Sequence, residues 1–235
     1  MTTYVLIPGA GGDAWYWHLL ERELRERGHE TVAVDLPAGD DSAGLSEYTD
    51  VVVAAIGDRA DLVLVAQSMG GLTAPLVCER VPVDLLIMLN AMVPPEPGET
   101  PKEWWSNTSH ERARREQAER DGRVLDSEDL RETFFHDVSS EVVEEAWARR
   151  EPSQSGTPFM KPWPLPEWPE VPTRFLQARD DRFFPVEFQR RVVQERLCIT
   201  PDEMDGGHLV ALSRPKELAD RLEAYRKDVT LTENY

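Results

Sequence analysis

Short, continuous runs of hydrophobic residues alternate along this chain with longer segments in which hydrophobic positions recur every three or four residues. Short apolar runs are typical of parallel strands buried on both faces, and the longer periodic segments are typical of helices. Strands that alternate with helices indicate an α/β protein with a doubly wound, mostly parallel sheet. We predict strands at 4–7, 31–36, 62–66, 84–90, 172–178 and 197–203, and helices at 14–27, 45–58, 70–81, 186–196 and 214–227.

The region from 94 to 168 interrupts this alternation. It opens with Pro94-Pro95-Glu96-Pro97-Gly98, contains two charged stretches with helical periodicity, and closes with several prolines. Proline clusters of this kind mark turns and breaks between regular elements. We interpret 94–168 as a mostly helical cap inserted between two strands, so that 1–93 and 169–235 form the core.

A serine stands where the third predicted strand must turn sharply into a helix. The apolar run 62–65 leads into Ala66-Gln67-Ser68-Met69-Gly70-Gly71. A strand-to-helix turn of this kind strains its central residue and exposes the hydroxyl above the sheet, and small neighbours tolerate that backbone. The segment departs from the Gly-x-Ser-x-Gly motif only by alanine at position 66. An inert helix N-cap is the alternative interpretation of Ser68.

Possible partners for Ser68 follow in a defined order. Asp181 follows the fifth predicted strand, and His208 lies in the glycine loop 205–209 after the sixth. The order serine, aspartate, histidine is that of α/β-hydrolase triads and differs from those of chymotrypsin and subtilisin. We predict that Ser68 is the nucleophile, His208 its general base and Asp181 the residue that orients the imidazole. Asp180, beside it, is the alternative acid.

A glycine-rich loop follows the first predicted strand. Pro8-Gly9-Ala10-Gly11-Gly12 begins where strand 4–7 ends, a place where a backbone N–H can complete an oxyanion hole. We predict that the amides of Ala10 and of Met69, the residue after the serine, are the two donors. Alternatively, the glycines are present only because they leave room for the start of the next helix.

These motifs resemble the α/β-hydrolase superfamily, particularly the branch of plant hydroxynitrile lyases, plant methyl-ester hydrolases and small bacterial esterases. The resemblance extends over nearly the whole chain and includes Ala14-Trp15-Tyr16-Trp17-His18 and Gly28-His29-Glu30. Pro8 stands where the superfamily commonly has a histidine that braces the oxyanion loop. Gly9 and Leu209 stand where the lyases have threonine and lysine. The resemblance therefore implies ester hydrolysis rather than cyanide chemistry.

Aromatic residues are concentrated in the predicted cap, which holds five of the seven tryptophans. Aromatic faces suit a pocket for an aromatic, cyclic or acyl group, although packing within the cap is the alternative role for each of them. We predict substrate contacts from Gly9, Trp104, Trp105, Phe135, Trp163 and Leu209.

Composition excludes several classes of protein. A chain of 235 residues with 40% hydrophobic content suits one α/β domain with an insertion. A net charge of −18 repels phosphate backbones and anionic membranes, so we expect neither a nucleic-acid nor a membrane partner. The N-terminus leads into a strand without signal-peptide features, which favours a soluble, cytoplasmic protein. Cys78 and Cys198 are isolated, so we expect them to be buried and reduced, with no metal or cofactor.

We therefore predict a serine carboxylesterase that acts on a small apolar or aromatic ester through an acyl-enzyme. A small-molecule substrate is the only partner that the sequence predicts, and nothing in it indicates an oligomeric state. A receptor-like ligand-binding protein with slow or no turnover, or a lyase of the hydroxynitrile lyase branch, is the alternative, because a fold does not determine a reaction.

Overall fold

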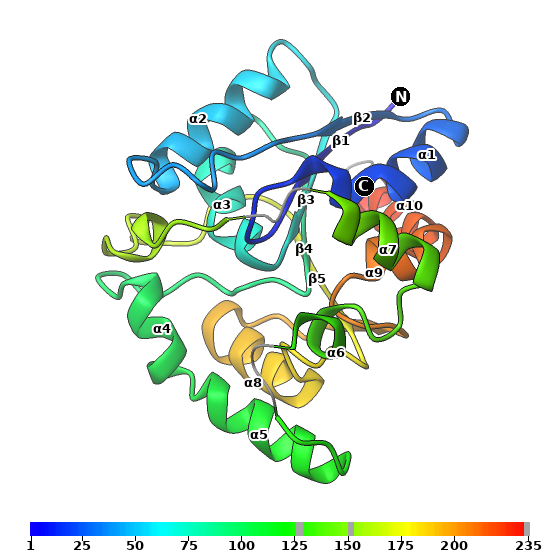
Figure 1. Cartoon of the computed structure of the whole chain (residues 1–235). Helices are drawn as coiled ribbons and strands as arrows, with labels where there is room; N and C mark the ends of the chain where they lie inside the picture. The colour runs from blue at the N-terminus through cyan, green and yellow to red at the C-terminus, as the bar shows by residue number, and fades with distance from the viewer. Residues whose placement is uncertain (126–128, 150–152, 233–235) are drawn as a thin grey trace.

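One parallel sheet of six strands forms the centre of the protein (Figure 1). The computed structural model describes residues 1–125, 129–149 and 153–232. Neighbouring strands in the order β2-β1-β3-β4-β5-β6 are all parallel. This arrangement confirms the predicted fold class. The strands are β1 (Thr3–Ile7), β2 (Glu30–Ala33), β3 (Leu62–Gln67), β4 (Leu85–Leu89), β5 (Thr173–Ala178) and β6 (Asp202–Met204).

Helices cover both faces of the sheet, as the alternating pattern predicts. One face is covered by α1 (His18–Glu26), α9 (Val210–Ser213) and α10 (Pro215–Thr232). The other face is covered by α2 (Leu45–Ile56), α3 (Ala74–Cys78) and α8 (Val186–Leu197). Two short 3-10 helices precede α1 and α3, namely η1 (Ala14–Trp17) and η2 (Ser68–Leu72). No helix in the described ranges is long and apolar enough to span a bilayer.

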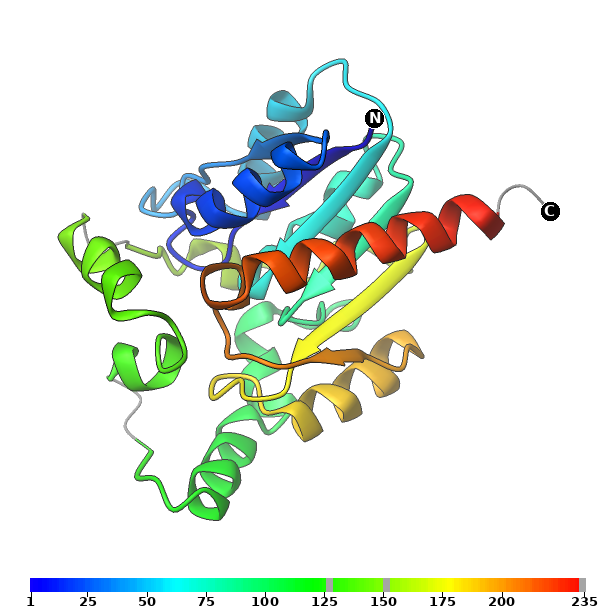
Figure 2. The same ribbon diagram turned by 90° about the vertical axis from the view of Figure 1, so that its right-hand side faces the viewer.

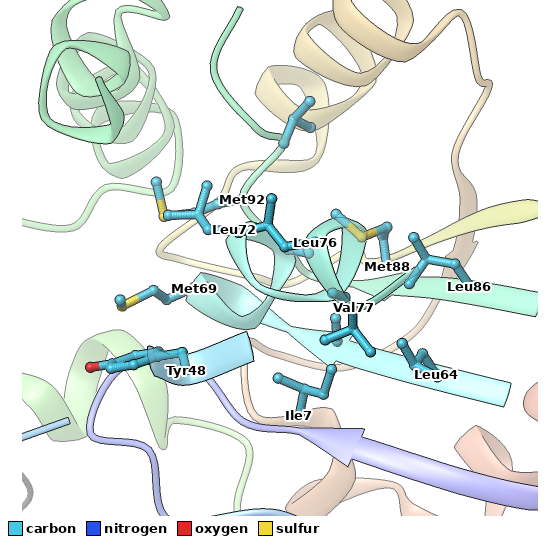
Figure 3. Close-up of a cluster of buried hydrophobic side chains, with 14 of the residues drawn as sticks. Ile7, Tyr48, Leu64, Met69, Leu72, Leu76, Val77, Leu86, Met88 and Met92 are labelled. Carbon is cyan, nitrogen blue, oxygen red and sulfur yellow. The ribbon is translucent and has the colours of Figure 1, made fainter. Parts of the chain in front are cut away.

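Successive residues of each central strand contribute to two different hydrophobic cores. Val5 and Ile7 of β1 belong to the cluster beneath α2, α3 and α8, whereas Tyr4 and Leu6 belong to the cluster beneath α1 and α10. Side chains along a strand point alternately to opposite faces, so a strand between two helical layers is apolar at every position. Figure 3 shows the first cluster, in which Ile7 lies near side chains from β3, β4 and α3.

The chain between β4 and β5 forms short helices, of which α6 and α7 lie beyond the arrowheads of the strands (Figure 2, green). The first of these helices begins at a capping box, in which Thr100 Oγ1 accepts from Glu103 N (3.1 Å) and the Glu103 carboxylate accepts from Thr100 N (2.8 Å). Residues 126–128 and 150–152 lie outside the described part of the chain. The helices are α4 (Pro101–Asn107), α5 (His110–Arg120), α6 (Leu130–Phe134), α7 (Ser140–Ala148) and η3 (Thr157–Phe159).

Three expectations about local structure were wrong. The predicted strand 197–203 is mostly absent, because α8 continues to Leu197 and ends where Cys198 adopts a φ of 55°, leaving β6 only three residues. The predicted helix 70–81 is divided into η2 and α3, since Thr73 intervenes between them. Cys198 is exposed rather than buried because it lies at the helix end, and Cys78 is only half-buried.

Candidate active site

Ser68 occupies the sharp turn between β3 and η2. Its φ of 51° lies in the left-handed region that a residue with a side chain seldom adopts. Gly70 allows the turn, because a Cβ at that position would lie 2.7 Å from Pro8 O and 2.8 Å from Ile7 O. Met92 N donates a hydrogen bond to Ser68 O (2.8 Å), which fixes the turn further. With 7% of its surface exposed, the serine lies in a largely enclosed place at the carboxyl end of the sheet.

A buried carboxylate and imidazole are brought together by the loops after β5 and β6. Asp181 Oδ2 lies 2.8 Å from His208 Nδ1, and the two residues are 0% and 2% exposed. Asp181 Oδ1 accepts from the backbone amides of Phe183 (2.8 Å) and Phe184 (2.9 Å). Because a carboxylate oxygen accepts, this bond uses the proton on His208 Nδ1, and Nε2 is the ring nitrogen that the bond leaves free.

The adjacent aspartate has a different environment. Asp180 Oδ2 accepts from Gly206 N at 3.2 Å, and Asp180 N donates to Gly206 O at 2.9 Å. These bonds join the two loops that carry Asp181 and His208. In the geometry of the structure, Asp181 is thus the carboxylate that reaches the imidazole, and Asp180 connects the loops.

Amide side chains at the ends of buried strands hold the histidine loop beside the serine turn. Asn90 Nδ2 donates to His208 O (3.0 Å) and Asn90 Oδ1 accepts from Ala178 N (2.7 Å). Gln67 Nε2, from the residue before Ser68, donates to the same His208 carbonyl at 3.4 Å. Sequence reasoning missed these supports. The available signal was a polar amide at the end of an otherwise apolar strand.

Among the described residues, the Ser68 hydroxyl and the His208 imidazole are not joined by a hydrogen bond. The Gln67 side chain, from the residue before Ser68, reaches the His208 carbonyl, so the two segments are connected at this end of the sheet. Catalytic hydrogen bonds in proteins without substrate are often long or poorly aligned, and they tighten when substrate binds.

Two backbone amides, on the segments before and after the serine turn, make no hydrogen bond within the described residues. Met69 is the second residue of η2, where N–H groups lack partners within the helix. The Ala10 amide makes no hydrogen bond within the described residues, although Gly11 N and Gly12 N, which follow it, both donate one. The loop approaches the serine closely at Gly9, where a Cβ would lie 2.8 Å from Ser68 Cβ.

Three phenylalanines surround the imidazole of His208. The ring centroids of Phe134, Phe183 and Phe184 lie 5.2, 5.4 and 5.5 Å from it. His110 of α5 packs behind Phe183, and its Nε2–H donates to Phe183 O (2.7 Å). Burial lowers the pKa of His110 to about 4, so this second histidine is neutral at pH 7. The surroundings of the imidazole are therefore predominantly apolar.

The structure separates the predicted pocket residues into two groups. Gly9 approaches Ser68, whereas Leu209, which follows His208 in the chain, packs against the cluster beneath α1 and α10. The predicted aromatic residues pack mainly within hydrophobic clusters. Trp104 and Trp163 are 0% and 7% exposed in the cluster beneath α8. Trp105 is half-buried and stacks on Phe184 with ring centroids 6.3 Å apart, and Phe135 packs on Trp147 with ring centroids 4.9 Å apart.

The phenylalanines that contact the imidazole were absent from the predicted set. Phe134 is the neighbour of the predicted Phe135, and a five-residue helix has too little periodicity for the sequence to tell which of the two faces inward. Phe183 and Phe184 lie two and three positions after Asp181, and this proximity was the signal that sequence reasoning did not use. Among the described residues, no group of three or more His, Cys, Asp or Glu side chains is placed to hold a metal ion.

A parallel sheet between two helical layers, with a serine in a strained strand-to-helix turn, is typical of hydrolases of the α/β class. A model of the alpha/beta hydrolase family matches residues 4–221. The chain belongs to the alpha/beta hydrolase family, which confirms the resemblance noted in the sequence.

Its relatives include several plant enzymes. The chain is 28% identical to "Probable esterase PIR7A" of Oryza sativa subsp. indica over 93% of this chain and 94% of that protein. It is 24% identical to "Polyneuridine aldehyde esterase" of Rauvolfia serpentina over 92% of each. The crystal structure of a polyneuridine aldehyde esterase superposes with a TM-score of 0.76 at 22% identity, covering 96% of this chain and 99% of that one. A pyrethroid hydrolase from Sphingobium faniae JZ-2 gives a TM-score of 0.74 at 22% identity, covering 96% and 97%.

Proposed function

We propose that this protein is a serine carboxylesterase that hydrolyses a small apolar or aromatic ester through an acyl-enzyme. The observation that carries the proposal is the buried bond between Asp181 and His208 (2.8 Å), on a loop that Gln67 connects to the turn holding Ser68 at a φ of 51°. An inert N-cap serine would need neither the strained turn nor the oriented imidazole. Names of relatives such as "Probable esterase PIR7A" and "Methyl jasmonate esterase 1" support the same reaction.

In the proposed reaction, His208 Nε2 takes the proton of Ser68 as Oγ attacks the ester carbonyl. Asp181 keeps the proton on Nδ1 and stabilises the imidazolium that forms. The proton then passes from Nε2 to the leaving alkoxide, and an acyl group remains on Ser68. A water molecule, deprotonated by the same Nε2, attacks the acyl carbonyl. The bond between the acyl carbon and Ser68 Oγ then breaks, the proton passes from Nε2 to Oγ, and the carboxylic acid is released.

Two backbone amides are proposed to bind the oxyanion of each tetrahedral intermediate. Met69 N and Ala10 N lie on the two segments that meet at Ser68, and the Ala10 amide has no hydrogen-bond partner among the described residues. One donor of this kind contributes about 2.7–4 kcal/mol to transition-state stabilisation, because it is aimed at charge that develops only there.

The side chains around the imidazole favour an apolar substrate. Phe134, Phe183 and Phe184 surround His208, and Trp105 stacks on Phe184. Aromatic rings present large apolar faces with few rotatable bonds, which suits an aromatic or cyclic group. The net charge of −18 opposes the approach of anionic esters. A neutral ester of a small apolar acid or alcohol therefore fits the site best.

The test combines covalent labelling with turnover. The purified protein is treated with a fluorophosphonate probe and assayed with p-nitrophenyl acetate, p-nitrophenyl butyrate and a cyanohydrin. We expect the label on the peptide that contains Ser68, and release of p-nitrophenol that is lost in Ser68→Ala. Labelling without turnover of any ester would favour a receptor-like protein, and cyanohydrin cleavage without ester hydrolysis would favour a lyase.

A further inference from the structure

The loop that follows β1 has no polar side chain of its own. Residues 8–12 are a proline, an alanine and three glycines, so hydrogen bonds can hold only the loop backbone. Gly11 and Gly12 adopt φ values of 86° and 65°, conformations that glycine enters and leaves readily unless it is held. Two bonds hold Gly12, whose N–H donates to Gly9 O (3.1 Å) and whose carbonyl accepts from Leu36 N (2.8 Å).

A side chain from the segment between α7 and η3 supplies the remaining bond. Gln154 Oε1 accepts from Gly11 N at 3.1 Å. Within the ranges that the structure describes, no other side chain is hydrogen-bonded to loop 8–12. Gly11 directly follows Ala10, whose amide is the proposed oxyanion donor. A bond that fixes the Gly11 peptide therefore also restricts the orientation of the neighbouring Ala10 peptide.

The orientation of the Gln154 amide is determined by its other partners. Nε2 donates to Tyr48 OH (3.0 Å) and to Ser155 O (3.0 Å). A backbone carbonyl can only accept and a backbone N–H can only donate, so the flipped amide would place donor against donor at Gly11. Both amide hydrogens are thus used, and Oε1 faces Gly11.

The segment that carries Gln154 is anchored to the core just after the loop contact. Ser155 N donates to Ala38 O (2.7 Å), and Thr157 Oγ1 donates to Asp41 O (2.7 Å). Tyr48, on α2, is 1% exposed. Gln154 therefore has a rigid support, which a side chain needs if it is to restrict a glycine loop.

We propose that Gln154 is a positioning residue that holds the oxyanion loop so that the Ala10 amide points at the oxyanion, with Tyr48 holding Gln154 in turn. The inference rests on the proposed esterase function. Removing an oxyanion donor lowers kcat about 10²- to 10³-fold. Releasing the loop leaves the donor present but poorly aimed, so we expect a smaller loss of about 10- to 50-fold.

The test uses Gln154→Met, which keeps the length of the side chain and removes its polar atoms. The pre-steady-state burst with p-nitrophenyl acetate gives the acylation rate. We expect a loss of about 10- to 50-fold in that rate, a KM within about twofold, and an unchanged apparent pKa in the pH–rate profile, because His208 is untouched. Tyr48→Phe should lose about threefold, and the double variant should be no slower than Gln154→Met, since both act through one amide.

Thr49→Val is the matched control, because it removes a buried side-chain bond to Leu45 O (2.7 Å) next to Tyr48 without touching Gln154 or loop 8–12. It should leave the acylation rate unchanged. An unchanged rate in Gln154→Met, an equal loss in Thr49→Val, or additive losses in the double variant would overturn the inference. Absence of both p-nitrophenol release and labelling of Ser68 in the wild type would instead contradict the proposed function.

A second measurement does not depend on the folding of Gln154→Met. Amide hydrogen exchange at Gly11 should be protected in the wild type and about threefold faster in Tyr48→Phe, because that variant removes one of the two acceptors that orient Gln154 Nε2. Equal exchange in the two proteins would overturn the inference as well.

Discussion

The histidine side and the oxyanion side of the proposed active site are supported in different ways. His208 and Asp181 receive several bonds from core strands and loops, including those from Asn90, Gln177 and the amides of residues 183 and 184. The oxyanion loop receives a single side-chain bond within the described residues, from Gln154. The histidine side is therefore redundantly held by the sheet, whereas the oxyanion side depends on a segment inserted between β4 and β5.

This difference separates two properties of the enzyme. A redundant support keeps the proton-transfer groups aligned whether or not the inserted helices are docked. A single support makes the oxyanion donor sensitive to the position of the inserted segment. Changes to the histidine side should consequently be severe only when they alter the triad itself, and changes to the oxyanion side should be severe even when they are indirect.

The largest effect should come from Asp181→Asn, which removes the charge at the centre of the histidine side. The two oxygens of the Asp181 carboxylate accept from four donors, whereas an asparagine side chain has only one oxygen that can accept. The imidazole therefore loses the tautomer that carries its proton on Nδ1. We expect kcat for p-nitrophenyl butyrate to fall about 10⁴-fold. Asp180→Asn is the matched control and should stay near wild type, because its amide oxygen still accepts from Gly206 N. Similar losses in both variants would show that the two aspartates are not distinguished as the geometry indicates.

The next largest effect should come from Gly9→Ala, which disturbs the oxyanion side directly. The added Cβ would lie 2.5 Å from Gln67 Oε1 and 2.8 Å from Ser68 Cβ, so the loop must move away from the serine. We expect kcat to fall about 10²-fold, as for loss of one oxyanion donor, with an unchanged circular dichroism spectrum. Gly156→Ala is the control, since a Cβ at that position would have no other atom within 4 Å. A Gly9→Ala enzyme with wild-type kcat would show that the loop position does not limit catalysis.

The same division explains how far the sequence could predict the molecule. The parallel sheet, the strained turn at Ser68 and the bond between Asp181 and His208 were predictable, because buried strands and the residues at their carboxyl ends leave strong local patterns. The supports Asn90, Gln67 and Gln154 were not, because each acts through a contact with a segment far away in the chain. The error at 197–203 has a local cause, since Leu197 to Thr200 fit a helix end and a strand start equally well.

Acid should destabilise the fold through His110, which packs behind the histidine side. Burial lowers the pKa of His110 to about 4, whereas a histidine in the unfolded chain has a pKa near 6.5. Between about pH 6.5 and pH 4, the unfolded state therefore binds a proton at His110 that the folded state does not bind. The stability of the fold is lost as the pH falls through this range. We expect the loss from this group to be on the order of 2 kcal/mol.

The measurement compares urea unfolding of the wild type with that of His110→Gln at pH 7 and pH 4.5. Glutamine does not titrate and can still donate to Phe183 O, so its variant should lose less stability between the two pH values. Carboxylates that titrate in both proteins cancel in the difference. Equal pH dependence in the two proteins would show that His110 does not contribute to acid unfolding.

The smallest effect should come from Asp137→Ala, which removes the bond from the inserted segment to the histidine side. Asp137 Oδ2 accepts from Gly207 N at 2.7 Å, directly before His208. The loop keeps its bonds from Asn90 and the link to Asp181, so the imidazole should stay in place. We expect the acylation rate to fall no more than about threefold, well below the loss for Gln154→Met, although each variant removes one side-chain bond to one backbone amide. Asp137→Asn, which retains an acceptor for Gly207 N, should match the wild type. If Asp137→Ala were as slow as Gln154→Met, both sides of the site would depend on the inserted segment, and the distinction between redundant and single support would be wrong.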